Sequence, residues 1–508
     1  MHQTPLRLDA QPLTIAEVES VARHRRPVEL GPTARQRMLG ARSIVDRRAA
    51  GTEPLYGINT GFGSLSRVRV AADGIRAMQR NLVRSHAAGV GDLLPSDVVR
   101  AMMLLLAASL SRGRSGVRPE LVERILLYLD LDLVPEVPSR GSVGASGDLA
   151  PLAHVALTLL GEGMVRSRGE RVPTQLALRC RDLQPLDLEA KEGLALINGT
   201  HFMAASGALL LADLERLFDT ALFAAALSID ACRATDTFLD PRLHDARCQP
   251  GQCEVARRVR AALDGSQVLP AHRENDPRVQ DPYCLRALPQ VLGAALDAFT
   301  YARGAIEREL GAVTDNPLVF AGDGNGDILS GGNFHGMPLA IPLDAIAIAM
   351  CHVAGISERR VNWLVSAHDP QNPVPAYVSP QPGLHSGLMI AQYAAAACCN
   401  EMMTLATPAS VGNVTTSAGI EDYNSMGATS ALKAHRSYNL LVSVIAIEIL
   451  TMTEAMEYQR PLRSGHVVER GIAAIREVVP KLVADRSPAP DIAAIERLIR
   501  AGALRAAP

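Results

Sequence analysis

The sequence predicts an all-α protein in which a smaller mixed N-terminal region, with glycine-containing loops, precedes a long central bundle of helices. Hydrophobic residues make up 48% of the chain but aromatic residues only 4%, so Ala, Leu, Val, Ile and Met must build the core. These residue types are typical of packed helices. Long apolar segments with helical spacing support the same class. We expect residues 1–200 to form the N-terminal region and residues 201–508 to form the helix bundle with a helical tail.

The charge balance excludes several classes of partner. The 508-residue chain has a formal net charge of −2, a pI near 6.7 and no long basic run, so nothing indicates nucleic acid or an anionic membrane. Its first residues lack the apolar core of a signal peptide, and Asp344 and His352 interrupt the apolar stretch 341–357. We therefore expect a soluble, cytoplasmic protein that binds a small molecule.

The eight cysteines are scattered along the chain. Cys248 and Cys253, with His244 nearby, could indicate a metal site, but no second close pair completes a zinc-binding set. We favour reduced thiols over disulfide bonds and expect no bound metal.

The N-terminal region contains two candidate reactive side chains. Residues 13–50 show helical patterning with many arginines, which is typical of a solvated helical face. Residues 54–64 hold three glycines within seven positions, which predicts a mobile loop with Tyr56 at its head. Residues 75–91 are expected to form a helix that includes His86. Taken alone, a loop tyrosine is more often a packing residue and a helical histidine more often a satisfied polar group.

The stretch 141–152 reads Gly-Ser-Val-Gly-Ala-Ser-Gly-Asp-Leu-Ala-Pro-Leu. Its three small residues Ala145, Ser146 and Gly147 permit a tight backbone bend, and glycine at the last position tolerates unusual backbone angles. The plain alternative is a glycine-rich turn before the apolar segment 149–161.

Asn198 directly precedes a long apolar helix that we expect over about residues 201–235. It could be an N-cap only, although a helix N-terminus also supplies a partial positive charge. We assign no role to the neighbouring His201. The segments 97–112 and 119–130 are apolar with helical spacing and are expected to be core.

Residues 240–282 are polar and contain prolines, so we expect a surface excursion between long helices. Gln280 lies near its end. Tyr283 and Arg286 are three residues apart and would share one face of the helix that follows. The planar guanidinium of arginine suits a carboxylate, although a surface arginine on a helix is the simpler interpretation.

The expected helix 284–312 leads to two loops that alone would be interpreted as turns. Asn316 lies in the sequence Thr-Asp-Asn-Pro-Leu, and Phe334 lies in Gly-Gly-Asn-Phe-His-Gly. Glu421 follows a Thr/Ser-rich stretch, which could be capping chemistry. Further helices are expected at about 341–366, 387–406 and 428–457, followed by a helical tail over 470–508.

Together these motifs resemble the aromatic amino acid ammonia-lyase and aminomutase family, from about Leu55 to about Met456. The resemblance implies that Ala145-Ser146-Gly147 cyclises with loss of water to 4-methylidene-imidazol-5-one, an electrophile that no ordinary side chain provides. It implies that Tyr56 removes a proton from the substrate β-carbon, which requires a pKa well below the ordinary value of about 10 and a positive field nearby. The other catalytic positions that it implies are Asp148, Asn198, Tyr283 and Phe334.

The resemblance also implies substrate-binding positions. Arg286 would hold the substrate carboxylate, and His86 and Glu421 would hold its ring. Gln280 would lie beside the reacting centre and Asn316 near the carboxylate. Histidine-specific members have Glu where this chain has Glu421, and a carboxylate can pair with an imidazole N–H but gains nothing comparable from a phenyl ring. The pattern therefore predicts non-oxidative elimination of ammonia from L-histidine to give trans-urocanate.

Three departures leave alternatives open. Histidine-specific members usually read Asn-Gln-Glu-Asp-His where this chain has Gly419, Ile420 and Tyr423 around the Glu-Asp pair. A tyrosine or phenylalanine ammonia-lyase, or an aromatic 2,3-aminomutase, is the first alternative, and a non-catalytic helical scaffold is the second. The resemblance implies a homotetramer with active sites shared between neighbouring chains, although a monomer could also bury the long apolar helices.

Overall fold

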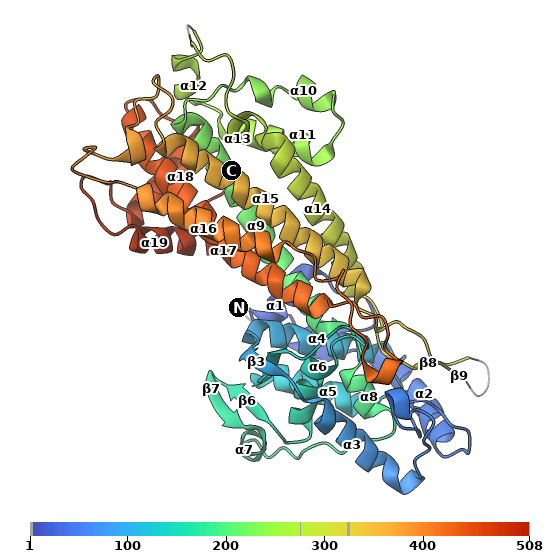
Figure 1. The fold of residues 1–508 in the computed structure, drawn as a ribbon. Helices are drawn as coiled ribbons and strands as arrows, with labels where there is room; N and C mark the ends of the chain where they lie inside the picture. The colour runs from blue at the N-terminus through green and yellow to red at the C-terminus, as the bar shows by residue number, and fades with distance from the viewer. Residues whose placement is uncertain (1–3, 275, 323–325, 507–508) are drawn as a thin grey trace. The chain divides into compact units, whose positions relative to one another are not determined.

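The computed structural model describes residues 4–274, 276–322 and 326–506, and its elements are labelled in Figure 1. Helices account for 57% of the residues and strands for 8%, so the predicted all-α class is confirmed.

The chain divides into two compact units, each assembled from three separate segments. Unit 1 comprises Met1–Leu209, Ala302–Asp344 and Pro408–Leu432, and unit 2 comprises Leu210–Tyr301, Ala345–Thr407 and Lys433–Pro508. The division of the chain at residue 200 stays a prediction.

Unit 1 contains all strands of the described chain and several shorter helices, together with the first turns of α9, α15 and α17. Its elements are β1 (Leu6–Leu8), α1 (Ile15–Ala22), β2 (Val28–Leu30), α2 (Pro32–Ala49), η1 (Gly63–Leu65), η2 (Ala72–Gly74), α3 (Ile75–His86), β3 (Val90–Leu93), α4 (Ser96–Ser111), α5 (Pro119–Asp130), β4 (Leu133–Pro135), β5 (Pro138–Arg140), α6 (Leu149–Leu159), β6 (Met164–Ser167), β7 (Glu170–Pro173), α7 (Thr174–Arg179), α8 (Glu192–Ile197), β8 (Leu318–Phe320), β9 (Asp327–Leu329) and η5 (Ser417–Gly419).

The helix α4 is the centre of the unit 1 core. Every residue from Val98 to Ser111 is buried, and the helix packs against α1, α2 and α5. A helix that is apolar on all sides requires neighbours on all sides. Its buried Arg100 donates hydrogen bonds to the carbonyls of Val21, Ala22 and Leu129, and its charge is paired with the Asp132 carboxylate at 3.1 Å.

The strands of unit 1 form small sheets. β1 and β2 are parallel, whereas the pairs β3–β5, β4–β6, β6–β7 and β8–β9 are antiparallel. The strands have only three or four residues each, which explains why the sequence pattern indicated a mixed region but no individual strand.

Two segments of unit 1 with helical patterning differ in detail from a continuous helix. The segment 13–50 forms α1 and α2 with β2 between them, because Arg25 has a positive φ of 54° that a helix cannot accommodate. Pro32 then occupies the first turn of α2, where its missing N–H has no cost. The segment 75–91 is helical only as far as His86, and the chain then continues into β3 through Gly91 with a φ of 84°.

Unit 2 contains the long helices, shown for α15, α16 and α17 in Figure 1. Its elements are α9 (His201–Ala231), η3 (Thr237–Leu239), α10 (Pro241–Asp245), α11 (Pro250–Ala262), α12 (Val268–Ala271), α13 (Tyr283–Arg286), α14 (Leu288–Glu309), α15 (Met337–Val365), η4 (Ala376–Val378), α16 (Met389–Leu405), α17 (Gly427–Gln459), α18 (His466–Val478) and α19 (Ala489–Arg500). The polar segment 240–282, expected to be a surface excursion, contains the thirteen-residue helix α11.

A buried charge cluster connects three long helices of unit 2. The Glu448 carboxylate of α17 accepts hydrogen bonds from Arg360 on α15, at 2.9 Å from Nη2, and from Ser228 on α9, at 2.6 Å. Ser357 on α15 donates to the same carboxylate. Arg360 and Glu448 are fully buried, so this pairing links the three helices within an otherwise apolar core.

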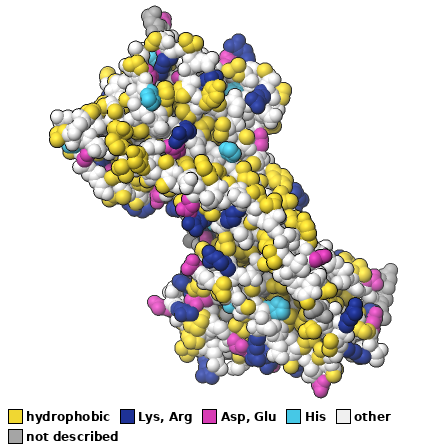
Figure 2. Space-filling view, viewed as in Figure 1, with side chains coloured by type: hydrophobic (Ala, Val, Ile, Leu, Met, Phe, Trp, Pro, Cys, Tyr) yellow, Lys and Arg dark blue, Asp and Glu magenta, His cyan; other side chains and the backbone are white. Residues whose placement is uncertain are grey.

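The helices α15 and α17 are apolar and long enough, by length and composition alone, to cross a membrane. In their most apolar stretches, however, 67% and 83% of the residues are buried within the protein, as expected of core helices. Figure 2 shows hydrophobic side chains on the surface over α16, and Ile390, Tyr393 and Met403 of that helix are exposed.

Candidate active site

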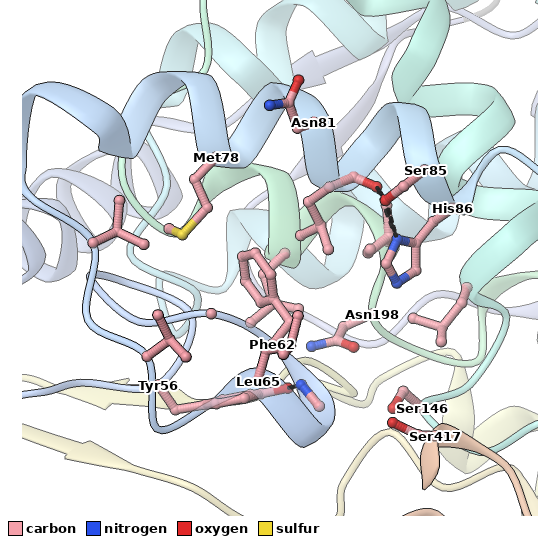
Figure 3. A pocket seen from close by; sticks show the side chains of 18 of the residues that line it. Tyr56, Phe62, Leu65, Met78, Asn81, Ser85, His86, Ser146, Asn198 and Ser417 are labelled. Atoms are coloured by element: carbon pink, nitrogen blue, oxygen red, sulfur yellow. Dashed lines mark hydrogen bonds between the residues drawn. The ribbon is translucent and has the colours of Figure 1, made fainter.

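One pocket in unit 1 brings together residues from distant parts of the sequence. Its cavity volume is about 760 Å³, and its described lining residues all belong to unit 1. Figure 3 shows Tyr56 on the loop before α3, and the His86 ring pointing from α3 toward the part of the pocket that contains Asn198 and Ser146. Of the predicted site residues, the lining includes Tyr56, His86, Ser146, Asn198 and Glu421.

The segment Ala145-Ser146-Gly147 is held in a bend by the backbone of Gly199. The Gly199 N–H donates to the Ser146 carbonyl at 3.3 Å, and the Asp148 N–H donates to the Gly199 carbonyl at 2.7 Å. Gly147 has a φ of 77°, and a Cβ at this residue would lie 2.1 Å from the Gly199 oxygen. Only glycine fits at this position.

Asp148 connects this bend to the first turn of α9. Its carboxylate accepts hydrogen bonds from the N–H groups of Phe202, at 2.8 Å, and Met203, at 3.1 Å. These groups would otherwise lack partners at the helix N-terminus. Burial raises the pKa of Asp148 to about 7, although the two backbone N–H groups act in the opposite direction. The carboxyl of this predicted catalytic residue is therefore also a helix cap.

Asn198 is not the N-cap of α9. Its side-chain Nδ2 donates to the Asn316 carbonyl at 2.9 Å and lies 3.5 Å from Oδ1 of Asp315. The loop after α14 therefore fixes the orientation of the Asn198 amide at the pocket wall.

Sequence reasoning missed a buried ion pair behind Asn198. The Lys191 Nζ atom lies 2.6 Å from Oδ2 of Asp315. Burial lowers the pKa of Lys191, and the Asp315 carboxylate opposes that shift. The composition of the sequence could have drawn attention to Lys191. It is one of only three lysines in a chain rich in arginine, and it lies three residues before the apolar segment that begins at Leu194.

The glycine-rich loop holds Tyr56 with its ring against Phe62, at an edge-to-face distance of 6.4 Å between centroids. The Tyr56 hydroxyl accepts a hydrogen bond from the Gly63 N–H at 3.4 Å. Burial raises the pKa of Tyr56 above its ordinary value, the Gly63 N–H lowers it, and the negative charge of Glu421 raises it. The described surroundings therefore act against the lowered pKa that we expected for a catalytic base.

Gln79 is a second residue that the motifs did not indicate. Its buried side chain donates to the Gly57 carbonyl at 3.2 Å and accepts from the N–H groups of Gly193, at 2.8 Å, and Leu194, at 3.2 Å. It therefore connects the tyrosine loop to the start of α8. An isolated glutamine on an amphipathic helix carries no sequence signal for such a contact.

His86 lies in the last turn of α3. Its Nδ1 is 2.8 Å from the Leu82 carbonyl and 3.1 Å from Oγ of Ser85, as Figure 3 shows. Because a carbonyl oxygen can only accept, the hydrogen bond to Leu82 places the ring proton on Nδ1. In the neutral ring, Nε2 then keeps a lone pair that can accept a hydrogen bond.

Glu421 lies in a short loop that returns on itself. Thr416 donates its hydroxyl to the Glu421 carboxylate at 2.7 Å and its N–H to the Glu421 carbonyl at 2.9 Å. The same loop reaches the bend before Ala145, since the Met426 N–H donates to the Val143 carbonyl at 2.9 Å. This connection positions the Glu421 loop beside the predicted prosthetic segment.

Tyr423, which stands where histidine-specific members usually have His, is exposed and lies close to the segment after β9. Its ring stacks against His335 with a centroid distance of 6.5 Å, and its carbonyl oxygen is 3.0 Å from Nε2 of that histidine.

Asn316 and Phe334 belong to unit 1 but are not among the described lining residues of the pocket. Asn316 accepts a hydrogen bond from the Gly331 N–H at 2.7 Å and one from the Ser330 hydroxyl at 3.2 Å. Its side chain therefore holds the loop that leads to Phe334. The predicted roles of both residues stay predictions.

The predicted carboxylate-binding group lies in unit 2. Arg286 donates through Nε to the Asp281 carbonyl at 2.9 Å, and its guanidinium lies 4.4 Å from the centre of the Tyr283 ring. The two residues share one face of α13, as their spacing predicted. Gln280 and Tyr283 are exposed. The roles of these three residues stay predictions.

The cysteine and histidine motif behaves as ordinary structure. All eight cysteines are free thiols, and the Nδ1 of His244 is 2.9 Å from the Gln252 amide. Within the described ranges no group of three His, Cys, Asp or Glu side chains is arranged to hold a metal ion.

Comparison with known proteins decides the family. Residues 13–477 match the family model of the aromatic amino acid lyases. The chain belongs to the aromatic amino acid lyase family. It is 47% identical over 503 residues to a histidine ammonia-lyase of Sorangium cellulosum, with 98% of both chains covered, and 44% identical to one from Myxococcus xanthus, with 100% of this chain and 99% of that one covered.

Solved structures of lyases and aminomutases share this fold. A tyrosine aminomutase from Streptomyces globisporus gives a TM-score of 0.92 at 35% identity, covering 99% of this chain and 98% of that one. A histidine ammonia-lyase from Trypanosoma cruzi gives 0.90 at 36% identity, covering 99% and 94%. Both activities of the aromatic amino acid lyase family therefore occur on closely similar backbones, so side chains of the pocket must decide between them.

Proposed function

We propose that the chain eliminates ammonia from L-histidine without oxidation and releases trans-urocanate. The observation that supports this most directly is the pocket of unit 1, in which His86 and Glu421 line the same cavity as Ser146 and Tyr56. The relatives from Sorangium cellulosum and Myxococcus xanthus are named as histidine ammonia-lyases. The Nε2 acceptor of His86 and the Glu421 carboxylate offer hydrogen-bond acceptors of the kind that imidazole N–H groups require.

We propose that Ala145, Ser146 and Gly147 form the 4-methylidene-imidazol-5-one group of the family. The fit of glycine alone at residue 147 and the hydrogen-bonded bend around Gly199 support this assignment. When formed, the group supplies an electrophile that makes the substrate nitrogen a better leaving group. Asp148 and Gly199 would hold the segment in place through the contacts described above, and Asn198 would lie against the group, as the resemblance implies.

Within this proposal, Tyr56 accepts the proton from the substrate β-carbon. Its ring is held by Phe62 and its loop by Gln79, so the phenol oxygen stays at the pocket wall. Since burial raises the pKa of Tyr56, the reaction requires a positive group near the phenol in the assembled enzyme. We propose a homotetramer in which neighbouring chains complete the site, with Arg286 and Asn316 at the substrate carboxylate and Gln280, Tyr283 and Phe334 beside the reacting centre.

The second candidate is a tyrosine-specific lyase or 2,3-aminomutase. The departures at Gly419, Ile420 and Tyr423 favour it, because they replace polar groups that histidine-specific members carry in this loop. The similarity to the Streptomyces globisporus tyrosine aminomutase is compatible with this second candidate function.

The test is a product assay in which the purified protein is incubated separately with L-histidine, L-tyrosine and L-phenylalanine. Ammonia and the conjugated acid are followed together, and β-amino acids are measured by chromatography. Urocanate from histidine alone supports the proposal, whereas coumarate, cinnamate or a β-amino acid as the main product overturns the substrate assignment. In parallel, Ser146→Ala should abolish turnover and remove the near-ultraviolet absorbance of the prosthetic group, while size-exclusion chromatography with light scattering measures the oligomer.

A further inference from the structure

A second pocket in unit 1 is lined by three arginines and by no described carboxylate. Its cavity volume is about 800 Å³, and it shares no lining residue with the candidate active site. Arg37 comes from α2, and Arg112 and Arg114 come from the segment between α4 and α5. The remaining described lining residues are uncharged. A concave surface with three positive groups and no negative one attracts anions.

Arg112 is fixed at the pocket wall by two backbone carbonyls. Its two terminal nitrogens donate to the carbonyls of Ala10, at 2.7 Å, and Gln11, at 2.9 Å. Its Nε atom is buried and has no hydrogen-bond partner within the described chain. No carboxylate of the described chain pairs with this guanidinium, so its positive charge at the pocket wall is not balanced by a neighbouring side chain.

The other two guanidinium groups are also available. Neither Arg37 nor Arg114 makes a side-chain hydrogen bond or ion pair with any residue that the structure describes. The Arg114 guanidinium lies 4.8 Å from the centre of the Phe320 ring. Stacking of this kind occupies the flat face of the group and leaves its N–H edge free to donate.

The frame that holds these side chains is closely packed. Gly113 has a φ of 69°, and a Cβ there would lie 2.7 Å from the carbonyl carbon of Arg37. The loop between Arg112 and Arg114 therefore contacts the backbone of α2 directly. The first turn of this eighteen-residue helix contains no acidic residue, and Thr33 and Gln36 from its start also line the pocket. The Asp9 carboxylate accepts the Ala34 N–H at 2.8 Å and so already occupies the N-terminus of this helix, which leaves the three arginines as the source of positive charge in the pocket.

We propose that this pocket binds a small phosphate-bearing anion, whose oxygens are held by Arg37, Arg112 and Arg114. A single carboxylate balances one guanidinium, whereas a phosphate group has close to two negative charges and several acceptor oxygens that donors on separate segments can share. The site is independent of the proposed reaction and requires neither the prosthetic group nor an amino acid.

The test uses sodium pyrophosphate as the probe and isothermal titration calorimetry on the full-length protein at low ionic strength. We expect saturable binding that weakens at least tenfold in Arg37→Gln and in Arg114→Gln. Gln36→Glu, which adds a negative charge to the lining while keeping all three arginines, should weaken binding by a similar factor. Arg179→Gln is the matched control, because Arg179 is an exposed arginine of unit 1 outside this pocket.

Three results would overturn the proposal: no saturable binding to the wild-type chain, unchanged affinity in the three pocket variants, or equal weakening in Arg179→Gln. Tighter binding of citrate than of pyrophosphate would overturn the assignment of phosphate. Since the altered side chains are exposed, thermal unfolding of each variant should match the wild type and confirm that the fold is intact.

Discussion

The Lys191 ammonium and the Asp315 carboxylate form a buried ion pair, 2.6 Å apart, behind the wall of the candidate active site. The second oxygen of Asp315 accepts the Asn316 N–H at 2.6 Å and lies 3.5 Å from the Asn198 amide. Neither residue of this pair is among the described lining residues of the pocket. The pair nevertheless orients the Asn198 side chain, a predicted catalytic group, and the backbone of Asn316, a predicted substrate-binding residue.

Replacement of Lys191 by Met should destabilise the protein by about 3–5 kcal/mol, because it leaves the Asp315 carboxylate buried without its partner. Activity should fall with it, since the Asp315 carboxylate beside Asn198 is no longer held in place by Lys191. Urea unfolding and steady-state kinetics measure the two effects.

A double variant, Lys191→Met with Asp315→Leu, separates stability from activity. Removing both charges should restore most of the stability, as replacement of buried ion pairs by apolar residues often does. The turnover number should stay low, because Asn198 keeps the Asn316 carbonyl as an acceptor but loses the Asp315 carboxylate, which also holds the Asn316 N–H. Recovery of full activity in the double variant would contradict a positioning role for the pair.

Asp148 should make stability depend on pH. Burial raises its pKa from 3.8 to about 7, so the folded state binds a proton that the unfolded state has already released between these values. Its contribution to stability is therefore present below pH 4 and is lost as the pH rises toward 7, by at most about 1.4 kcal/mol per pH unit. Asp148→Asn keeps a side-chain oxygen for the α9 N–H groups and should abolish this slope.

Urea unfolding of wild type and Asp148→Asn at pH 5, 6, 7 and 8 provides the measurement. The free-energy difference between them should move in favour of the variant as the pH rises. A constant difference across this range would show that the carboxyl does not titrate there.

Replacement of Gln79 by Met should loosen the Tyr56 loop. The variant leaves the Gly57 carbonyl and the Gly193 N–H without their partner, and each unsatisfied buried group costs about 1–3 kcal/mol. We expect turnover to fall more than substrate affinity, together with faster proteolysis within residues 54–64. Gln175→Met, at an exposed glutamine of α7, is the control and should match the wild type in both assays.

Long apolar helices were predictable because their signal is local. The expected segments 201–235, 387–406 and 428–457 correspond to α9, α16 and α17 within a few residues at each end. The helix α11 was missed because its segment is polar and begins at Pro250, which favours a turn in a sequence pattern but fits the first turn of a helix equally well.

The sequence could indicate residues of the candidate site only where the reactive groups lie within one contiguous motif. The bend around Ser146 and the loop around Tyr56 are contiguous, so a resemblance could identify them. The Lys191–Asp315 pair joins residues 124 positions apart, and the contacts of Gln79 join three segments. Such supporting contacts exist only after the chain has folded, which explains why the sequence indicated reactive side chains but not the groups that orient them.

Glu421→Gln should change both substrate choice and the pH profile. The negative charge of Glu421 raises the pKa of Tyr56, so its removal should lower that pKa. Because the proposed base acts as the phenolate, the acidic limb of kcat/KM should then shift to lower pH. The KM for histidine should rise, since the neutral amide loses the charged contact to the imidazole.

The neighbouring carboxylate provides the control for this prediction. Asp422 is exposed and lies in the same loop, so Asp422→Asn removes one charge from the loop surface without changing the pocket lining. Its pH profile should match the wild type, because solvent screens an exposed charge. An equal shift in both variants would mean that the net charge of the loop, and not the Glu421 carboxylate in the cavity, controls the ionisation of Tyr56. A shift of the acidic limb to higher pH in Glu421→Gln would contradict the assignment of Tyr56 as the base whose pKa Glu421 raises.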